Sequence, residues 1–236
     1  MSTVLVTGAN RGIGYEHVRQ YAQKNWNVIA CARHPEHSKE LAELKKQYDN
    51  NFTTEELDVT NHDQIDSLSK KYSKTPIDIL INNAGTGGPE GMPGAMDYQK
   101  IDNMDYQIWR DILEVNLLAP FKVATSFHKQ ISISDKKILI MMSSDLGSVY
   151  QNTFGGLYSY RASKSGLNVI AKGMSNEWKD IIVVTLAPGW CRTHLGGAEA
   201  EIDPGDSVEQ QQKMFESLTA SDNGKFLDRF GNDVPW

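Results

Sequence analysis

Residues 3–14 read Thr-Val-Leu-Val-Thr-Gly-Ala-Asn-Arg-Gly-Ile-Gly, an apolar run that leads directly into a glycine-rich turn. The unbroken apolar run at 4–6 is typical of a strand that is buried on both faces of a parallel sheet. Gly8, Gly12 and Gly14 allow the backbone to turn tightly and to approach a pyrophosphate at the start of the following helix. Because the glycines lie between the first predicted strand and the first predicted helix, they predict a dinucleotide site.

Short apolar runs alternate with amphipathic stretches along most of the chain. The predicted strands are residues 3–7, 27–32, 53–57, 77–82, 137–142, 181–186 and 225–227, and the predicted helices are residues 12–25, 36–48, 61–73, 103–130 and 158–178. This alternation predicts an α/β fold, a Rossmann-type doubly wound parallel sheet, in a single domain over residues 1–236. Residues 86–95, rich in Gly and Pro, and the polar residues 188–223 are predicted as loops, the second of them a substrate loop.

Composition excludes several classes of protein. The net charge of −6 over 236 residues argues against a nucleic-acid-binding protein. No apolar stretch reaches the roughly 18 residues that span a bilayer, and a first strand at Thr3 leaves no room for a signal peptide, so we expect a cytoplasmic protein without membrane contact. Cys31 and Cys191 are far apart and lack metal-like spacing, so we expect neither a disulfide nor a metal site.

Tyr160 and Lys164 lie four residues apart in the run Tyr-Ser-Tyr-Arg-Ala-Ser-Lys of residues 158–164. On a helix, this spacing places both side chains on one face. A free tyrosine has a pKa of about 10, and a nearby ammonium group favours the phenolate and so lowers that pKa. The pair predicts a proton donor for carbonyl chemistry, although the same spacing also fits a solvated helix face.

The end of the second predicted strand carries information on the cofactor. An NAD site usually places Asp or Glu there, about 20 residues after the glycines. Here the strand ends Ala-Cys-Ala followed by Arg33, without a carboxylate. The guanidinium groups of Arg33 and Arg11 could hold a 2′-phosphate, which favours NADP(H), although each arginine alone could be a surface residue. Asp58, after the third strand, could touch the adenine or serve as a helix-capping turn residue.

Together these motifs resemble the short-chain dehydrogenase/reductase family in its single-domain form, over nearly the whole chain. The motifs, which occur in the family's order, are the glycine run at 7–14, Asn82-Asn83-Ala84-Gly85, Asn116, Ser143-Ser144, Tyr160 with Lys164, and Pro188-Gly189. Residues 144–148, 158–164, 188–190 and 230–236 are similar to those of the C-factor and Sniffer-like carbonyl reductases. The resemblance implies an NADPH-dependent carbonyl reductase.

The resemblance also implies roles for individual residues. Ser144 would hydrogen-bond the substrate carbonyl oxygen, with Ser143 as a rival. Tyr160 would donate the proton; Tyr158 is a rival phenol, but only Tyr160 has a lysine four residues later. By the same resemblance, Lys164 would bind the nicotinamide ribose and perturb Tyr160.

Further implied contacts concern a proton relay and the cofactor. Asn116 would hold a water in a relay with Lys164, or it could merely interrupt a helix through a side-chain hydrogen bond. Asn82 would support the central strand, and Thr193 would meet the nicotinamide carboxamide. The full set of implied cofactor contacts is Gly8, Asn10, Arg11, Gly12, Ile13, Gly14, Arg33, Asp58, Val59, Asn83, Ala84, Gly85, Tyr160, Lys164, Pro188, Gly189, Trp190 and Thr193. Without the family, 82–85 would read as an ordinary turn.

The chain departs from the family pattern near the substrate. Fifteen residues lie between Ser144 and Tyr160, a few more than is usual, which predicts an unusual pocket. Cys191 takes a position where a small aliphatic residue is common. Because this position is close to the nicotinamide, a minor alternative is that Cys191 is a thiol sensitive to oxidation. The aromatic residues close to these positions suggest an apolar pocket, though they could equally be core; they are Tyr150, Phe154, Tyr158 and Trp190.

The sequence thus favours an enzyme that reduces a ketone or aldehyde by hydride transfer, with a small carbonyl or alcohol compound as its partner. The resemblance further implies a homodimer or homotetramer built through residues 103–130 and 158–178. One alternative is a nucleotide-binding signalling or regulatory protein of the same fold with little turnover. Another is an NAD-dependent alcohol dehydrogenase, which Arg33 argues against.

Overall fold

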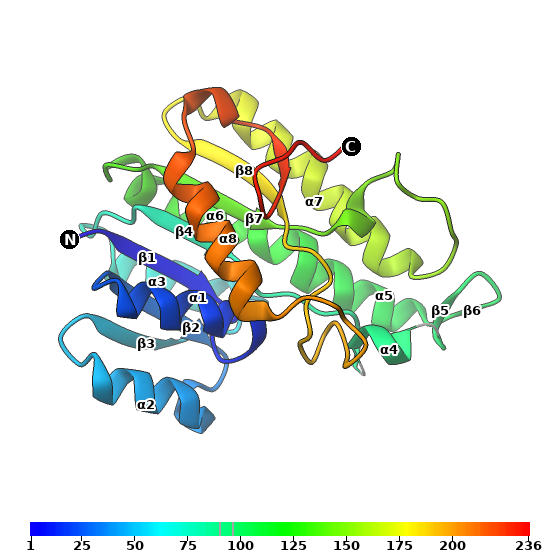
Figure 1. Ribbon diagram of the computed structural model, residues 1–236, viewed down its shortest axis with the longest axis horizontal. Coiled ribbons are helices and arrows are strands. Elements are labelled where there is room, and N and C mark those ends of the chain that lie inside the picture. The colour runs from blue at the N-terminus through cyan, green and yellow to red at the C-terminus, as the bar shows by residue number, and fades with distance from the viewer. Residues whose placement is uncertain (90, 96) are drawn as a thin grey trace.

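The computed structural model describes residues 1–89, 91–95 and 97–236. Its centre is a parallel sheet in the strand order β3-β2-β1-β4-β7-β8-β9 (Figure 1). The strands are β1 (Thr3–Thr7), β2 (Asn27–Ala32), β3 (Phe52–Glu56), β4 (Ile79–Asn82), β7 (Ile138–Met142), β8 (Ile182–Ala187) and β9 (Phe226–Asp228). Every predicted strand is present, with its ends within two residues of the prediction.

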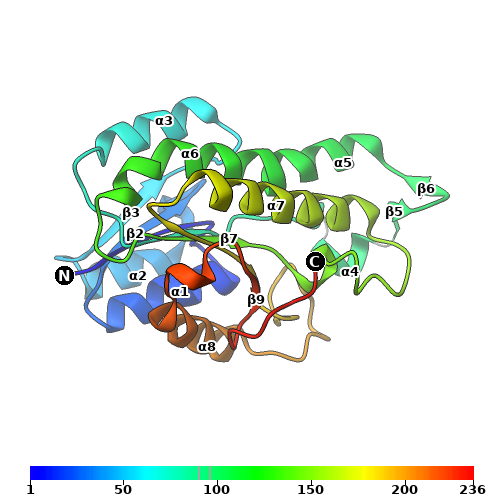
Figure 2. The ribbon, with the colours of Figure 1, turned by 90° about the horizontal axis from the view of Figure 1, so that it is seen from above.

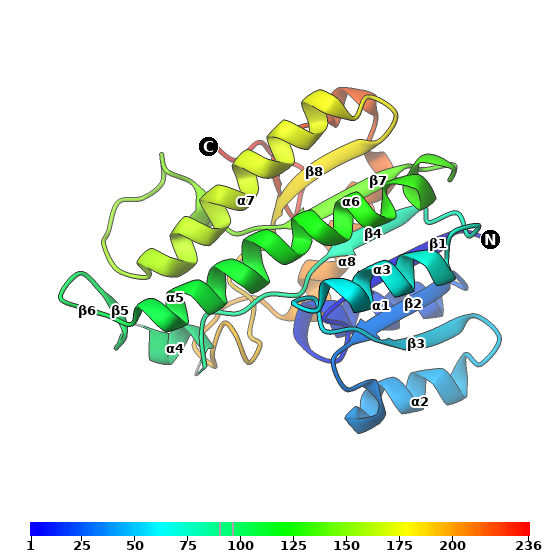
Figure 3. The same ribbon diagram turned by 180° about the vertical axis from the view of Figure 1, so that it is seen from behind.

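Helices cover both faces of the sheet, as Figures 2 and 3 show. One face carries α1 (Gly12–Gln23), α2 (Lys39–Gln47) and α8 (Pro204–Ser217), and the other carries α3 (His62–Lys71), α5 (Tyr106–Leu113), α6 (Ala119–Ser132) and α7 (Tyr158–Glu177). A separate apolar core lies on each side of the strands. Residues of β1, β4 and β7 are almost completely buried because they pack against helices on both sides. The predicted Rossmann-type doubly wound fold is confirmed.

The long helix predicted at 103–130 is interrupted. Its start is replaced by a two-stranded hairpin, β5 (Gln99–Lys100) with β6 (Asn103–Met104). Asp105 then caps α5 by accepting hydrogen bonds from the backbone N–H groups of residues 107 and 108. A π-helical turn at Glu114–Leu118 separates α5 from α6. Pro120 explains the break between α5 and α6, because it has no N–H to donate to the carbonyl of Asn116 four residues earlier.

Two segments predicted as loops contain helices. Residues 86–95 include the short helix α4 (Gly91–Ala95), and Glu90 in that segment lies outside the described residues. Residues 188–223 include α8, which begins at the capping residue Asp203 and packs against α1. The prediction missed α8 because its buried face is partly polar; the buried residues there include Ser207, Gln211 and Gln212 beside Val208 and Phe215. Of the helices described, none combines the length and the apolar character needed to cross a bilayer.

Candidate active site

A cavity of about 480 Å³ opens at the carboxyl ends of the central strands. It lies at β1, which pairs with β2 on one side and with β4 on the other. From β1 the strand order runs to β2 and β3 toward one edge of the sheet, and from β4 to β9 toward the other edge. Ligands of open α/β sheets bind at such a switch point. Twelve of the predicted cofactor residues line the cavity; they are Gly8, Asn10, Arg11, Gly12, Ile13, Arg33, Asp58, Val59, Asn83, Ala84, Gly85 and Thr193.

The three positions of the turn require glycine for different structural reasons. Gly8 and Gly12 have φ angles of +66° and +56°, a left-handed conformation that favours glycine. Gly14 does not line the cavity, but a Cβ atom there would lie 2.3 Å from the carbonyl oxygen of Gly8 and 2.4 Å from Nδ2 of Asn83. Its lack of a side chain therefore lets α1 pack closely against the turn.

The segment after β4 is tied to the end of β1. The backbone N–H groups of Asn83 and Ala84 both donate to Oγ1 of Thr7, each at 3.0 Å. The Asn83 side chain also donates to the carbonyl of Thr7 at 2.9 Å. Asn82 supports the neighbouring helix instead, through a 3.1 Å hydrogen bond to the carbonyl of Pro120. The motif at 82–85 thus holds together the floor of the cavity rather than forming an isolated turn.

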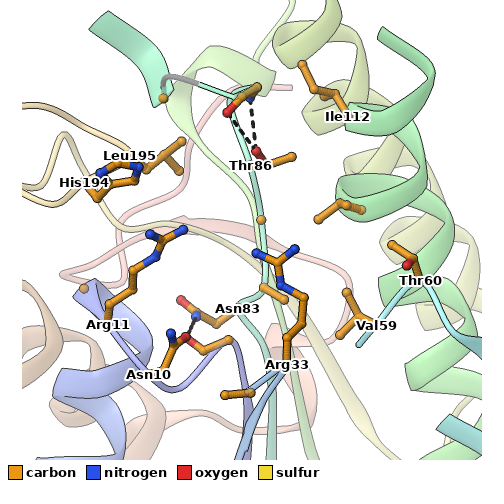
Figure 4. Close-up of a pocket in the computed structure, with 18 of the residues that line it drawn as sticks. Asn10, Arg11, Arg33, Val59, Thr60, Asn83, Thr86, Ile112, His194 and Leu195 are labelled. Atoms are coloured by element: carbon orange, nitrogen blue, oxygen red, sulfur yellow. Dashed lines mark hydrogen bonds between the residues drawn. The ribbon is translucent and has the colours of Figure 1, made fainter. Parts of the chain in front are cut away.

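Two cationic side chains extend into the cavity from the ends of β1 and β2. Figure 4 shows the guanidinium groups of Arg11 and Arg33 reaching over the floor of the pocket. Both side chains are exposed, and within the described part of the chain neither guanidinium has an ion pair or a hydrogen bond. Asp58 also lines the cavity, but its Oδ1 accepts hydrogen bonds from the N–H and the hydroxyl of Thr60. Asp58 therefore stabilises the turn after β3 and still faces the pocket.

Ser144, Tyr160 and Lys164 lie close together, although none of them lines the cavity. Burial raises the pKa of Tyr160 to about 12, while a hydrogen bond with the Ser144 side chain acts in the opposite direction. Burial lowers the pKa of Lys164 to about 8. The pKa of Tyr160 is therefore raised, and not lowered by Lys164 as predicted, because desolvation of the phenol dominates and Lys164 is not among the groups that shift it.

Lys164 connects this group to the cavity. Its Nζ lies 5.7 Å from the centre of the Tyr160 ring and donates to the carbonyl of Met142 at 2.8 Å. A Cβ atom on Gly85, which lines the cavity, would lie 3.6 Å from the same Nζ. An ammonium group has three protons, so two remain for a ligand in the cavity.

The surroundings of the rival residues separate them from the site. The hydroxyl of Ser143 is buried and donates to Oδ1 of Asn168 at 2.6 Å, so it is used in packing against α7. The Ser144 Oγ instead accepts from the N–H of Leu146 at 3.2 Å, and its side chain lowers the pKa of the Tyr160 phenol through a hydrogen bond. Tyr158 is the first residue of α7 and is only partly buried, next to Gly155 of the preceding loop. The geometry therefore groups Tyr160 with Ser144 and Lys164, as the motif predicts.

Asn116 is completely buried in the π-helical turn. Its Oδ1 accepts from the N–H of Thr86 at 2.8 Å, and its Nδ2 donates to the carbonyl of Thr86 at 2.8 Å and to Ser163 at 3.1 Å. Both amide protons are thus used within the protein, while Oδ1 can accept one more hydrogen bond. The position of a Cβ on Gly85 would be 3.4 Å from Oδ1, close to Lys164 as well.

The predicted residues at 188–193 form the opposite wall only in part. Thr193 lines the cavity, and its methyl group would be 3.1 Å from a Cβ on Gly12. Pro188, Gly189 and Trp190 do not line it, and the Trp190 indole donates to the carbonyl of Gly196 at 2.8 Å. Cys191 is buried, and burial raises the pKa of its thiol, which argues against the oxidation-sensitive alternative.

The aromatic residues suggested for a substrate pocket lie elsewhere. Tyr150, Phe154 and Trp190 are 80%, 57% and 53% exposed, and none lines the cavity. The Phe154 ring instead stacks against the guanidinium of Arg161, 4.3 Å from its centre. The longer loop between Ser144 and Tyr160 folds toward the chain end, where the Ser148 hydroxyl donates to the carbonyl of Pro235 at 2.5 Å.

The structure adds lining residues that the sequence did not predict. They are Ala32, Leu57, Thr60, Thr86, Gly88, Pro89, Gly91, Ile108, Asp111, Ile112, Val115, His194 and Leu195. Residues 86–91 follow the carboxyl end of β4, so the rule that ligands bind beyond strand ends could have found them. Ile108, Ile112 and Val115 are spaced as one helix face, a pattern that a buried core also produces.

Comparison with known proteins agrees with this arrangement. Residues 2–202 match the family model described as short chain dehydrogenase. C-signal of Myxococcus xanthus is 31% identical over 163 residues, which cover 68% of this chain and 93% of that protein. The structure of the carbonyl reductase Sniffer of D. melanogaster has a TM-score of 0.89 at 31% identity, covering 100% of both chains. The NADPH bound carbonyl reductase from chicken fatty liver has a TM-score of 0.85 at 28% identity, covering 100% of this chain and 99% of that one. The chain therefore belongs to the short-chain dehydrogenase family.

Proposed function

We propose that the protein is an NADPH-dependent carbonyl reductase that converts a ketone or aldehyde into an alcohol. The observation that carries the proposal is the group formed by the half-buried Ser144 with the buried Tyr160 and Lys164, whose lysine Nζ lies against Gly85 in the wall of the cavity. A nucleotide-binding protein without chemistry has no need of a hydrogen-bonded serine and tyrosine at this place. Carbonyl reductases among its structural neighbours support the same reading.

The residues of the cavity fit NADP(H). The start of α1 borders the pocket at Gly12 and Ile13, where the N–H groups of a helix start would bind a pyrophosphate. The guanidinium groups of Arg11 and Arg33 have no partner among the described residues, and Arg33 lies at the end of the second strand, where an NAD site would carry an acid. They are suited to a 2′-phosphate, which arginine binds with charge-assisted hydrogen bonds. Two free protons on Lys164 would hold the nicotinamide ribose.

Each catalytic side chain has a separate task. Bound NADPH supplies the hydride for the carbonyl carbon. The Tyr160 phenol would donate its proton to the carbonyl oxygen, and the Ser144 hydroxyl would hydrogen-bond the same oxygen as negative charge develops. A water beside Gly85, in reach of Asn116 Oδ1 and Lys164 Nζ, would return a proton toward Tyr160. Burial raises the pKa of Tyr160 to about 12, so the phenol carries its proton at neutral pH and is available as a proton donor.

The proposal is tested by replacing Tyr160 with Phe. This change removes one oxygen atom and little volume, so the fold and the cavity should remain. Wild-type protein is first screened for NADPH consumption with a panel of aldehydes and ketones. With the best substrate, we expect Tyr160→Phe to lower kcat by about 10²–10⁴-fold, the usual contribution of general acid catalysis. The dissociation constant for NADPH, measured by fluorescence titration, should change little.

Tyr158→Phe is the matched control, because it removes the neighbouring phenol that lies outside the buried group. Its kcat should stay within a few-fold of wild type. If no aldehyde or ketone of the panel is reduced, the proposal that the protein is a carbonyl reductase is contradicted. The 31% identity to C-signal then favours the second candidate, a nucleotide-binding signalling protein. For that candidate, Tyr160→Phe should preserve the biological role together with NADPH affinity.

A further inference from the structure

The helix that carries Tyr160 and Lys164 begins without a cap from its own sequence. The first four N–H groups of any helix lack partners within the helix and need acceptors from elsewhere. The residue before α7 is Leu157, which has a left-handed φ of 54° and no side-chain oxygen. A Ser, Thr, Asp or Asn at that position would normally accept from the second or third N–H of the helix. Here that acceptor must come from another part of the chain.

Gln99 of the β5–β6 hairpin supplies it. The side chain of Gln99 is completely buried. Its Oε1 accepts from the backbone N–H of Tyr160 at 3.0 Å and from the hydroxyl of Ser159. Tyr160 is the third residue of α7, so the amide of Gln99 occupies the place of an N-cap side chain although it lies 61 residues earlier.

The other end of the same amide reaches the wall of the cavity. Nε2 of Gln99 donates to the carbonyl of Gly87 at 2.9 Å. Gly87 lies between Thr86 and Gly88, both of which line the cavity, and Thr86 is itself held by Asn116. One buried side chain therefore connects the backbone of the proposed proton donor to the segment that borders the proposed cofactor site.

We propose that Gln99 is a positioning residue that fixes Tyr160 relative to the bound cofactor and substrate. The inference rests on the proposed function, because it gives Gln99 its role through the proton donor. A displacement of about 1 Å between reacting groups can cost on the order of 10²-fold in rate. Removing the amide would leave the N–H of Tyr160 and the hydroxyl of Ser159 without their acceptor, and the carbonyl of Gly87 would keep only the Tyr98 hydroxyl as a donor. The start of α7 would therefore lose its fixed position.

The test compares Gln99→Leu, which has no hydrogen-bonding group, with Gln99→Glu, which keeps the acceptor for Tyr160 and Ser159. We expect Gln99→Leu to lower kcat by about 10–100-fold, while the NADPH dissociation constant stays within about threefold of wild type. Gln99→Glu should recover a large part of kcat. Partial recovery is expected to increase at lower pH, because a protonated carboxyl can also donate to the carbonyl of Gly87.

Gln130→Leu is the matched control for the loss of a buried glutamine. Gln130 is also buried and donates to the carbonyl of Ser69 at 2.7 Å, in contact with α3 rather than the cavity. It should lower thermal stability as Gln99→Leu does but leave kcat within about twofold of wild type. A merely structural role for Gln99 would give both leucine variants the same kcat, and that result would overturn the proposal.

Backbone amide hydrogen exchange gives a readout that does not depend on turnover. In the ligand-free protein, Gln99→Leu should increase exchange at Tyr160 without changing exchange in the middle of α7, and Gln99→Glu should restore protection. Unchanged exchange at Tyr160 would overturn the capping role even if the protein is an active reductase. Altered exchange in a protein without reductase activity would instead contradict the proposed function while leaving the capping role in place. If Gln99→Leu does not fold, Gln99→Glu alone decides the test. Rapid hydrogen exchange at the Tyr160 backbone amide in that variant would contradict the role of residue 99 as the cap of α7.

Discussion

The two titratable groups of the site have pKa values that burial moves in opposite directions. The residues Tyr160 and Lys164 are 6% and 4% exposed. Burial disfavours the charged form of each, so it raises the pKa of Tyr160 and lowers that of Lys164. The site thus holds a protonated tyrosine beside a lysine whose lowered pKa, about 8, lies in the range of ordinary assays.

This difference predicts how activity depends on pH. Because the pKa of Lys164 lies at about 8, its charge is lost as the pH rises through 8. We expect kcat/KM for reduction, which reports groups of the free enzyme, to fall about tenfold per pH unit above that value. Lys164→Arg keeps its charge at all these pH values, so the fall near pH 8 should disappear even if the variant is slower. A fall at the same pH in both proteins would assign the titration to another group.

The neighbouring serines should respond to substitution in different ways. Ser144→Ala removes the hydroxyl that hydrogen-bonds Tyr160, so kcat should decrease by about 10²-fold, as for other donors to a developing oxyanion. Ser143→Ala removes a buried hydrogen bond to Asn168, so it should reduce the free energy of unfolding by about 1–2 kcal/mol with little change in kcat. Steady-state kinetics and urea unfolding of both variants test this. A larger loss of kcat at Ser143 would place the catalytic serine one residue earlier.

At the scale of elements, the sequence predicted what depends on local patterns and missed what depends on distant contacts. The strands were found because uninterrupted aliphatic runs are needed wherever helices cover both faces of a sheet. Pro120, just after the π-helical turn, is a local sequence signal for that turn. The role of the turn in holding Thr86 through Asn116 depends on a tertiary contact and has no such signal. Gln99 carries no motif at all, because its importance comes from a helix start 61 residues later.

The helix α8 shows a further limit of prediction, and it allows a direct test. Its apolar period is weak, but its start has a clear signal, since Asp203 accepts from the N–H of Gly205 at 2.8 Å and precedes Pro204. Asp203→Ala should cost about 1 kcal/mol, which lowers Tm by roughly 2–4 °C for a chain of this length. Asp203→Asn keeps an accepting oxygen and should stay close to wild type in thermal unfolding. Equal losses in both variants would show that the charge, and not the cap, matters.

At the scale of the whole molecule, the position of unpaired charge predicts the cofactor preference. Arg11 and Arg33 would each contribute roughly 1.5–3 kcal/mol to binding of a 2′-phosphate, before desolvation losses. NADPH should therefore bind at least about tenfold more tightly than NADH, because 1.4 kcal/mol corresponds to a factor of ten. Arg33→Asp should narrow or reverse that ratio in fluorescence titrations with both cofactors.

The control for this substitution must change the net charge by the same amount. Lys129→Asp does so at an exposed position in the last turn of α6, outside the residues that line the cavity. It should leave the ratio of the two dissociation constants unchanged. Equal dissociation constants for NADPH and NADH in the wild type would contradict the assignment of the two arginines.

The strand order also has a consequence for how the chain folds. On one side β1 pairs with β2, which follows within 30 residues. On its other side β1 pairs with β4, which is much later in the chain. The carboxylate of Asp78, just before β4, accepts a hydrogen bond from the N–H of Thr3, 75 residues earlier. While the chain is being synthesised, β1, β2 and β3 can pair locally, yet the inner edge of β1 stays open until β4 has emerged. An unpaired edge of this kind is a template for pairing with another chain. We therefore expect the interval between synthesis of β3 and of β4 to be one in which this chain is prone to pair with other chains.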